Sequence, residues 1–211
     1  MELQGYIKAA QVAESRFPVG GKIASINVKV GQTVKKGALL ASLNQSLLQT
    51  FLDRALLLYD KERADFDQKE KENLSEFEKR KRQNELDITV KNVEIAKQNL
   101  EETNLYSPVD GVVAAIDGGL VGENITPAKF TVTVVDTSSF YFEAEVAQLN
   151  LNQVEIRASA KVSLNGFNEP LSATVEMISL LPIRRDVYAV RLKLTSHQQL
   201  KPGFAGKAIF G

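Results

Sequence analysis

The sequence predicts a mainly β protein with an inserted α-helical coiled-coil hairpin and a small β-barrel. Two observations lead to this fold class. All 13 glycines and all 6 prolines lie outside residues 38–107, so this stretch has no helix breakers and is expected to be helical. The segments on either side of it are related by an internal repeat and alternate apolar and polar residues with the period of a β-strand.

Length and composition limit the possible functions. A chain of 211 residues allows one large domain or two small ones. Lys and Arg together number 26, as do Asp and Glu, so the basic excess of a nucleic-acid-binding protein is missing and no nucleic acid is expected as a partner. There is no cysteine, which excludes disulfides, thiolate metal ligands and cysteine nucleophiles. No apolar run approaches the roughly 20 residues of a membrane-spanning helix.

The repeat flanks the breaker-free stretch. Residues 18–26 match residues 108–116 at a constant offset, and Gly31 and Val34 then match Gly122 and Ile125 after one inserted residue. Each copy is too small to bury its own apolar face. We therefore expect residues 17–43 and 106–136 to pack together as one split β domain.

Residues 44–105 are predicted to form an antiparallel helical hairpin, because two apolar stripes with seven-residue spacing would both face water on a single long helix. The stripes consist of Leu48, Leu52, Ala55, Tyr59 and Phe66 and of Leu86, Val90, Val93 and Leu100. Ser75, followed three residues later by Glu78, predicts a capping box at the start of the second helix. The expected helices, Gln45–Glu72 and Glu76–Asn104, would each be about 42 Å long.

Residues 137–211 are predicted to form the β-barrel. Short β-rich segments alternate there with turn signals such as Asn165-Gly166 and Pro202-Gly203. Residues 1–16 are expected to add an N-terminal strand to this barrel.

The β segments also resemble a known family. Residues 21–40 look like the first half of a biotinyl/lipoyl-type domain, and residues 106–113 look like the second half. A helical hairpin that splits such a domain, followed by a barrel that ends in Leu200-Lys201-Pro202-Gly203, is similar to the HlyD-like periplasmic adaptor, or membrane fusion, proteins of bacterial efflux and secretion systems.

The resemblance implies a non-enzymatic subunit of a tripartite system. Such adaptors form rings, often hexameric, that bridge an inner-membrane transporter of the RND or ABC type and an outer-membrane channel protein. It also implies a periplasmic location, with anchoring to the inner membrane by an N-terminal segment absent from this chain. The alternative is a coiled-coil scaffolding or interaction module with no role in transport.

No catalytic, cofactor-binding or metal-binding residue is predicted. Carrier domains of the lipoyl type present their modified lysine on a turn that the hairpin replaces here, so no covalent cofactor is expected. The only histidine, His197, is expected to be an ordinary loop residue. Partner binding is instead predicted at the hairpin tip, because an apolar residue in an exposed turn indicates a contact surface. The predicted tip residues are Asn73, Leu74, Ser75 and Glu78.

Overall fold

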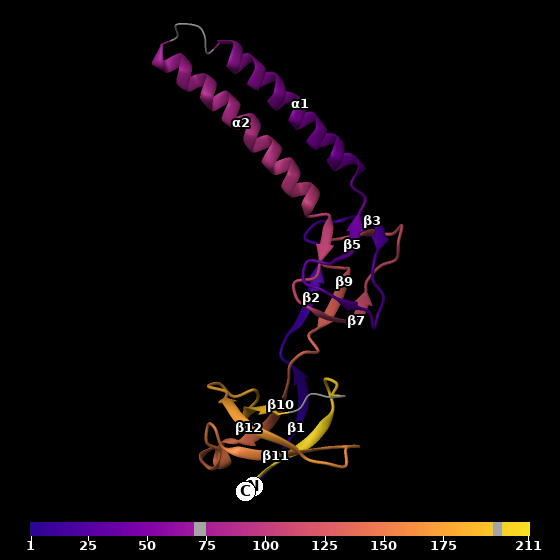
Figure 1. The fold of residues 1–211 in the computed structure, drawn as a ribbon, viewed down its shortest axis with the longest axis vertical. Coiled ribbons are helices and arrows are strands. Elements are labelled where there is room, and N and C mark those ends of the chain that lie inside the picture. Colours follow the sequence, from indigo (N-terminus) through magenta and orange to yellow (C-terminus); the bar gives the residue numbers. More distant parts are fainter. Residues whose placement is uncertain (70–74, 196–199) are drawn as a thin grey trace. The chain divides into compact units, whose positions relative to one another are not determined.

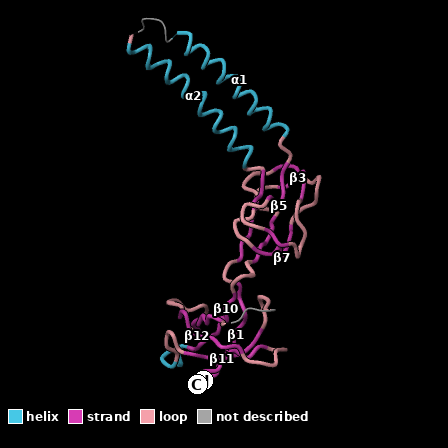
Figure 2. Tube along the Cα trace, in the orientation of Figure 1, coloured by secondary structure: helices cyan, strands magenta, loops and turns pink. Residues whose placement is uncertain are grey.

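A computed structural model describes residues 1–69, 75–195 and 200–211 of the chain, which forms two compact units (Figure 1). The first, here called the barrel unit, contains residues 1–13, 109–112 and 134–211. The second, the hairpin unit, contains residues 14–108 and 113–133. The fold class is as predicted: a six-stranded closed barrel, further β-sheets and a hairpin of two helices (Figure 2).

The barrel has the strand order β1-β10-β13-β12-β11-β14, and every neighbouring pair is antiparallel. Side chains alternate between its interior and its surface along the strands, as in β1, where every second residue is buried. The interior includes the fully buried Ile7, Phe142 and Leu192. The strands are β1 (Glu2–Ala9), β10 (Phe140–Ala147), β11 (Ser159–Leu164), β12 (Leu171–Ile178), β13 (Val187–Leu194) and β14 (Ala205–Phe210).

A pair of glycines allows β1 and β14 to pack closely against their other neighbours, β10 and β11. Gly5 and Gly206 lie directly opposite each other in the register. A Cβ atom on Gly5 would lie 2.0 Å from the backbone oxygen of Glu143, and one on Gly206 would lie 2.4 Å from that of Ser163. Because backbone atoms cannot move aside as a flexible side chain can, both positions require glycine.

Residues 1–16 supply a strand to the barrel and a further strand to another sheet, whereas the sequence indicated the barrel strand alone. Only β1 joins the barrel, whereas β2 (Val12–Arg16) pairs with β9 in another sheet. Backbone hydrogen bonds from Ala10 N–H to the Ser139 carbonyl and from Asp136 N–H to the Gln11 carbonyl accompany the change of sheet. The second strand was not expected, because no glycine or proline marks the break between the two strands.

The remaining strands form two four-stranded sheets, ordered β2-β9-β7-β4 and β6-β5-β3-β8. Phe17 and Phe130 are buried there, with their ring centroids 5.7 Å apart. The strands are β3 (Gly21–Ile26), β4 (Thr33–Val34), β5 (Leu39–Leu43), β6 (Asn104–Tyr106), β7 (Gly111–Asp117), β8 (Asn124–Ile125) and β9 (Thr131–Val135).

The internal repeat is confirmed as a reciprocal structural pair. The N–H of Gly31, in a turn of the first copy, donates to the carbonyl of Val113 in the second, at 2.8 Å. The equivalent N–H of Gly122 donates to the carbonyl of Ile23, the counterpart of Val113, also at 2.8 Å. Each copy therefore supplies a strand edge that holds the turn of the other, as expected for halves too small to fold alone.

The copies differ at one turn position. Gly37 has a φ of 82°, and Ala128, which occupies the corresponding place in the second copy, has a φ of 61°. The N–H groups of these two residues donate to the corresponding carbonyls of Ser107 and Phe17. Alanine pays a steric cost in this left-handed conformation that glycine does not.

The hairpin consists of α1 (Ser46–Lys69) and α2 (Glu76–Glu101), which run side by side in Figure 1. The second helix ends three residues before the predicted Asn104, because Asn104 pairs with Ser42 in the β5–β6 ladder. The predicted end of the first helix at Glu72 lies outside the described residues.

Candidate functional site

The predicted tip residues fall into two groups. Asn73 and Leu74 lie outside the described residues. Ser75 and Glu78 form the predicted capping box: the Glu78 N–H donates to Ser75 Oγ at 3.3 Å, and the Ser75 N–H donates to the Glu78 carboxylate at 3.0 Å. The Ser75 hydroxyl also donates to this carboxylate, at 2.6 Å. These bonds satisfy backbone donors at the start of α2.

The capping bonds affect the titration of the first turn of α2. Hydrogen bonds from the Ser75 hydroxyl and then from its backbone N–H hold the pKa of Glu78 below its ordinary value. The pKa of Glu76 is lowered by its hydrogen bond with Lys79, at 2.8 Å. Both carboxylates are therefore ionised at neutral pH, and the positive end of the helix dipole stabilises their negative charge.

Phe77 is a tip-side residue that the sequence reasoning missed. It lies in the first turn of α2 with 77% of its surface exposed. Its position in a highly charged segment, two residues after the cap, was an available signal. An aromatic side chain this exposed is a feature of contact surfaces.

The hairpin helices carry apolar side chains beyond those that are buried in the seam between the two helices. In the seam, Leu52, Leu86 and Val93 are buried. A separate stripe on α1, which we call the flank stripe, consists of the exposed Leu47, Phe51 and Leu58, spaced four and seven residues apart. The outer face of α2 carries Ile88 and Ile95, seven residues apart, which we call the outer stripe.

The flank stripe and the outer stripe lie at matching heights along the hairpin. The amide Nε2 of Gln45 donates to Thr103 Oγ1 at 2.8 Å, which sets the helix register at the base. Counting from these two residues, Leu58 lies about 13 residues up α1 and Ile88 about 15 residues up α2. Phe51 and Ile95 lie about 6 and 8 residues up. At 1.5 Å per residue, each pair therefore differs in height by only about 3 Å.

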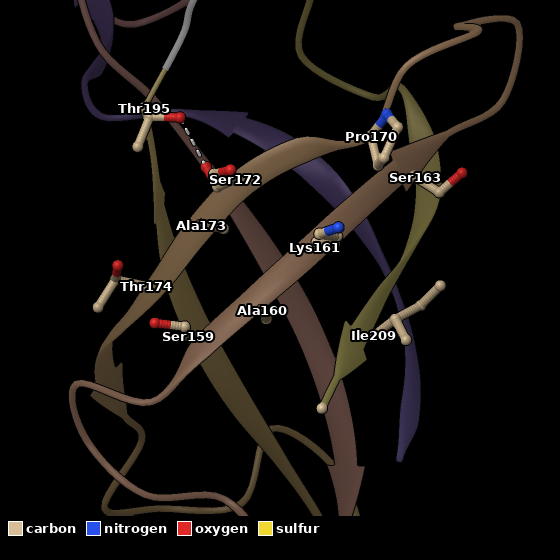
Figure 3. Close-up of a pocket in the computed structure, with 11 residues that line it drawn as sticks. Ser159, Ala160, Lys161, Ser163, Pro170, Ser172, Ala173, Thr174, Thr195 and Ile209 are labelled. Atoms are coloured by element: carbon tan, nitrogen blue, oxygen red, sulfur yellow. Dashed lines mark hydrogen bonds between the residues drawn. The ribbon is translucent and has the colours of Figure 1, made fainter.

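The barrel unit contains a shallow pocket of about 670 Å³ over strands β11, β12 and β14 (Figure 3). Its lining is mainly hydroxyl-bearing and small side chains around Lys161. The Thr195 hydroxyl donates to the Ser172 carbonyl at 2.9 Å. Lys161 is the one lysine among the described lining residues, which include no histidine or carboxylate side chain. The described lining thus offers no paired acid and base for catalysis.

The described ranges hold neither a cluster of metal-binding side chains nor a helix suited to span a membrane. Among residues 1–69, 75–195 and 200–211, no group of three or more His, Cys, Asp or Glu side chains is placed to hold a metal ion. Neither described helix of the hairpin is long and apolar enough to cross a membrane. His197 lies outside the described residues.

A lipoyl-type β domain split by a helical hairpin, together with a six-stranded barrel, is the fold of membrane fusion and periplasmic adaptor proteins. The resemblance inferred from the sequence is therefore confirmed in fold. No protein-family model matches the chain.

Three solved structures illustrate the similarity. A MacA–MexA chimeric protein containing the Pseudomonas aeruginosa MexA α-hairpin domain has a TM-score of 0.89 at 21% identity, covering 100% of this chain and 80% of the chimera. The membrane fusion protein Spr0693 from Streptococcus pneumoniae R6 has a TM-score of 0.84 at 17% identity, covering 100% and 98%. The periplasmic adaptor protein EmrA has a TM-score of 0.54 at 16% identity, covering 99% and 98%.

Proposed function

We propose that this protein is a periplasmic adaptor subunit of a bacterial efflux or secretion system. In this role it bridges an inner-membrane transporter of the RND or ABC type and an outer-membrane channel, and it acts by assembly into a ring rather than by catalysis. Its likeness in fold to membrane fusion proteins supports the class. The observation that carries the proposal is the pair of unpartnered apolar stripes on the hairpin.

The two stripes support ring assembly because they are different surfaces of the hairpin and their residues lie at similar distances from its base. A contact between two different surfaces is heterologous, and copies related by rotation about one axis can close it into a ring. With that axis parallel to the hairpin, Leu58 of one copy would face Ile88 of the next, and Phe51 would face Ile95. Burial of these aliphatic and aromatic side chains would stabilise the ring by about 25 cal/mol for each Å² of apolar surface removed from water.

Disulfide crosslinking tests this assembly, because the chain has no cysteine of its own. The double variant Leu58→Cys/Ile88→Cys is expected to form covalent oligomers up to the ring size under mild oxidation. The control, Leu57→Cys/Ile88→Cys, moves the first cysteine to an adjacent leucine that is 70% exposed and lies outside the flank stripe. Equal crosslinking of both variants, or none of the first, would contradict the proposed contact.

The second part of the proposal is that the hairpin tip contacts the channel, through the predicted Asn73, Leu74, Ser75 and Glu78 together with Phe77. Phe77→Asp is a discriminating variant. A carboxylate in the first turn of a helix is favourable, so α2 should remain intact while the apolar contact is lost. Leu74→Asp applies the same test to the predicted apolar tip residue.

We expect Phe77→Asp to preserve helix content and ring formation but to abolish export. Export would be measured by complementation of a strain that lacks this protein, scored as susceptibility to a panel of toxic compounds. The neighbouring exposed variant Glu76→Gln serves as the control and should complement fully. Full complementation by Phe77→Asp and Leu74→Asp would exclude the tip as the recognition element. Failure of the wild type to restore export would favour the scaffolding alternative.

A further inference from the structure

One end of the barrel carries a group of exposed aliphatic side chains. At this end β1 begins and β14 ends, and the Met1 carbonyl accepts a hydrogen bond from the Phe210 N–H. The end of β10 pairs there with the start of β13, through Ala147 and Val187. We call the exposed group the apolar rim; it consists of Leu149, Ile156, Leu180, Leu181 and Ile183.

The backbone forces part of the rim to project. Between β12 and β13, the Ser179 N–H donates to the Ala189 carbonyl and the Ile183 N–H donates to the Val187 carbonyl. Residues 180–182 are thus opposed only by Tyr188, and the surplus residues bulge outward. Leu180 and Leu181 are consequently 96% and 77% exposed.

A second segment adds to the rim beside this bulge. The short 3₁₀ helix η1 (Gln148–Gln153) is tied to the β12–β13 loop by a hydrogen bond from the Gln148 N–H to the Asp186 carbonyl, at 2.8 Å. Leu151 on η1 packs against the barrel core, whereas Leu149 is 93% exposed. The inward side of η1 thus closes the core, and its outward side presents another aliphatic tip.

Basic side chains follow the bulge directly. Arg184 forms an ion pair with Glu145 on β10. The side chain of Arg185 is 96% exposed, and its nearest acidic partner is Asp186 at 3.7 Å. The loop therefore places an almost fully exposed guanidinium next to the aliphatic side chains.

We propose that the apolar rim inserts into the surface of a lipid bilayer, with Arg185 contacting headgroup phosphates. Separate aliphatic tips on neighbouring loops suit a fluid apolar phase, which has no fixed shape to match. A protein partner would require a continuous complementary surface instead. Arginine beside such tips can stay at headgroup level while the apolar side chains enter the acyl region. This contact lies on the barrel and does not depend on the proposed ring or channel docking.

A site-specific fluorescent label tests insertion directly. Leu181→Cys would be labelled with the environment-sensitive dye NBD and mixed with vesicles of phosphatidylcholine and phosphatidylglycerol. We expect a blue shift with increased emission, and quenching by lipids that carry a nitroxide on the acyl chain. The matched control is Val121→Cys, an exposed apolar residue in a turn of the hairpin unit. An unchanged spectrum at position 181, or an equal shift at both positions, would overturn the proposal.

Unlabelled variants test the chemistry of the contact. Leu180→Ser/Leu181→Ser should reduce vesicle binding in flotation assays at least about tenfold, whereas Leu120→Ser/Val121→Ser should leave it unchanged. Arg185→Gln should weaken binding to vesicles that contain phosphatidylglycerol more than binding to pure phosphatidylcholine. All five positions are exposed, so the melting temperatures should match the wild type. Wild-type failure to float, or undiminished binding by the double leucine variant, would show that a lipid surface is not the partner.

Discussion

The barrel and the helical hairpin use their apolar residues in opposite ways. The barrel gathers most of its large apolar side chains into one buried cluster that includes Ile7, Phe142 and Leu192. In the described part of the hairpin helices, only Leu52, Leu86 and Val93 are buried, whereas eight large apolar side chains are exposed. The barrel is therefore stabilised by its own core, whereas the described hairpin helices leave most of their large apolar side chains on the surface.

The largest expected loss of stability comes from a substitution in the barrel that leaves every apolar side chain of its core unchanged. Gly5→Ala places a Cβ atom 2.0 Å from the Glu143 carbonyl oxygen, and the strands must separate to accommodate it. We expect the free energy of unfolding to fall by about 4 kcal/mol, as in severe overpacking. Chemical denaturation would measure the loss. Gly211→Ala is the control, since no atom lies within 4 Å of a Cβ there; a stable Gly5→Ala variant would refute the close packing.

Leucine truncation compares the two regions with the same chemistry. Leu192→Ala removes a fully buried barrel side chain and should cost about 3 kcal/mol. Leu57→Ala on the hairpin removes a side chain that is 70% exposed and should change stability by less than about 0.5 kcal/mol. Both would be measured by denaturation at low protein concentration. Similar losses in the two variants would mean that the comparison is wrong.

Substitutions at two equivalent turn positions extend the comparison of stability to the split β domain. Gly37→Ala would force alanine into a φ of 82° and should cost about 1 kcal/mol, whereas Ala128→Gly relieves a φ of 61° and should gain about 0.5 kcal/mol. Thermal unfolding of the two variants would show the opposite shifts. A destabilised Ala128→Gly variant would indicate that the methyl group makes a contact worth more than the strain.

The smallest expected effect concerns acid and the start of α2. Because capping bonds lower the pKa of Glu78 from its ordinary value of 4.5, the carboxylate stabilises the helix start above that pH. This contribution is lost as the pH falls through the lowered pKa. NMR of the α2 amides should show the first turn fraying below about pH 4.5, with the barrel amides unchanged. Glu78→Gln keeps a capping side chain without titration, so the pH dependence of its first turn should shrink to the part that Glu76 contributes.

The overall architecture could be predicted because its signals extend over many residues. The breaker-free stretch predicted the hairpin, and the repeat predicted the reciprocal packing that the Gly31–Val113 and Gly122–Ile23 hydrogen bonds confirm. The capping box at Ser75 and Glu78 was predictable because it depends on two residues at a fixed spacing. The end of α2 was not predictable, because Asn104 is recruited by strand pairing with Ser42.

The candidate surfaces were harder to predict than the fold. The sequence of the flank stripe shows seven-residue spacing, but so does the buried seam beside it, and only the packing separates Phe51 from Leu52. The apolar rim was also missed: Leu180 and Leu181 follow a β-rich segment, and the hydrogen bonds on either side of the bulge are what turn them outward. The role of the tip residues Asn73, Leu74, Ser75 and Glu78 in partner binding remains a prediction.

The reciprocal hydrogen bonds between the repeat copies constrain the order in which the parts of the protein can fold. As the chain becomes available for folding from its N-terminus, the first copy cannot reach its final form until Val113, about 80 residues after Gly31, has also emerged. The two helices can pair during this interval, because their contacts are closer in sequence, and their pairing brings Gln45 to Thr103. The hairpin thus shortens the search between the two copies, since closing a preformed loop costs less entropy than closing a free chain. The barrel can close last, because β1, near the N-terminus, completes its pairing only with β14, near the C-terminus.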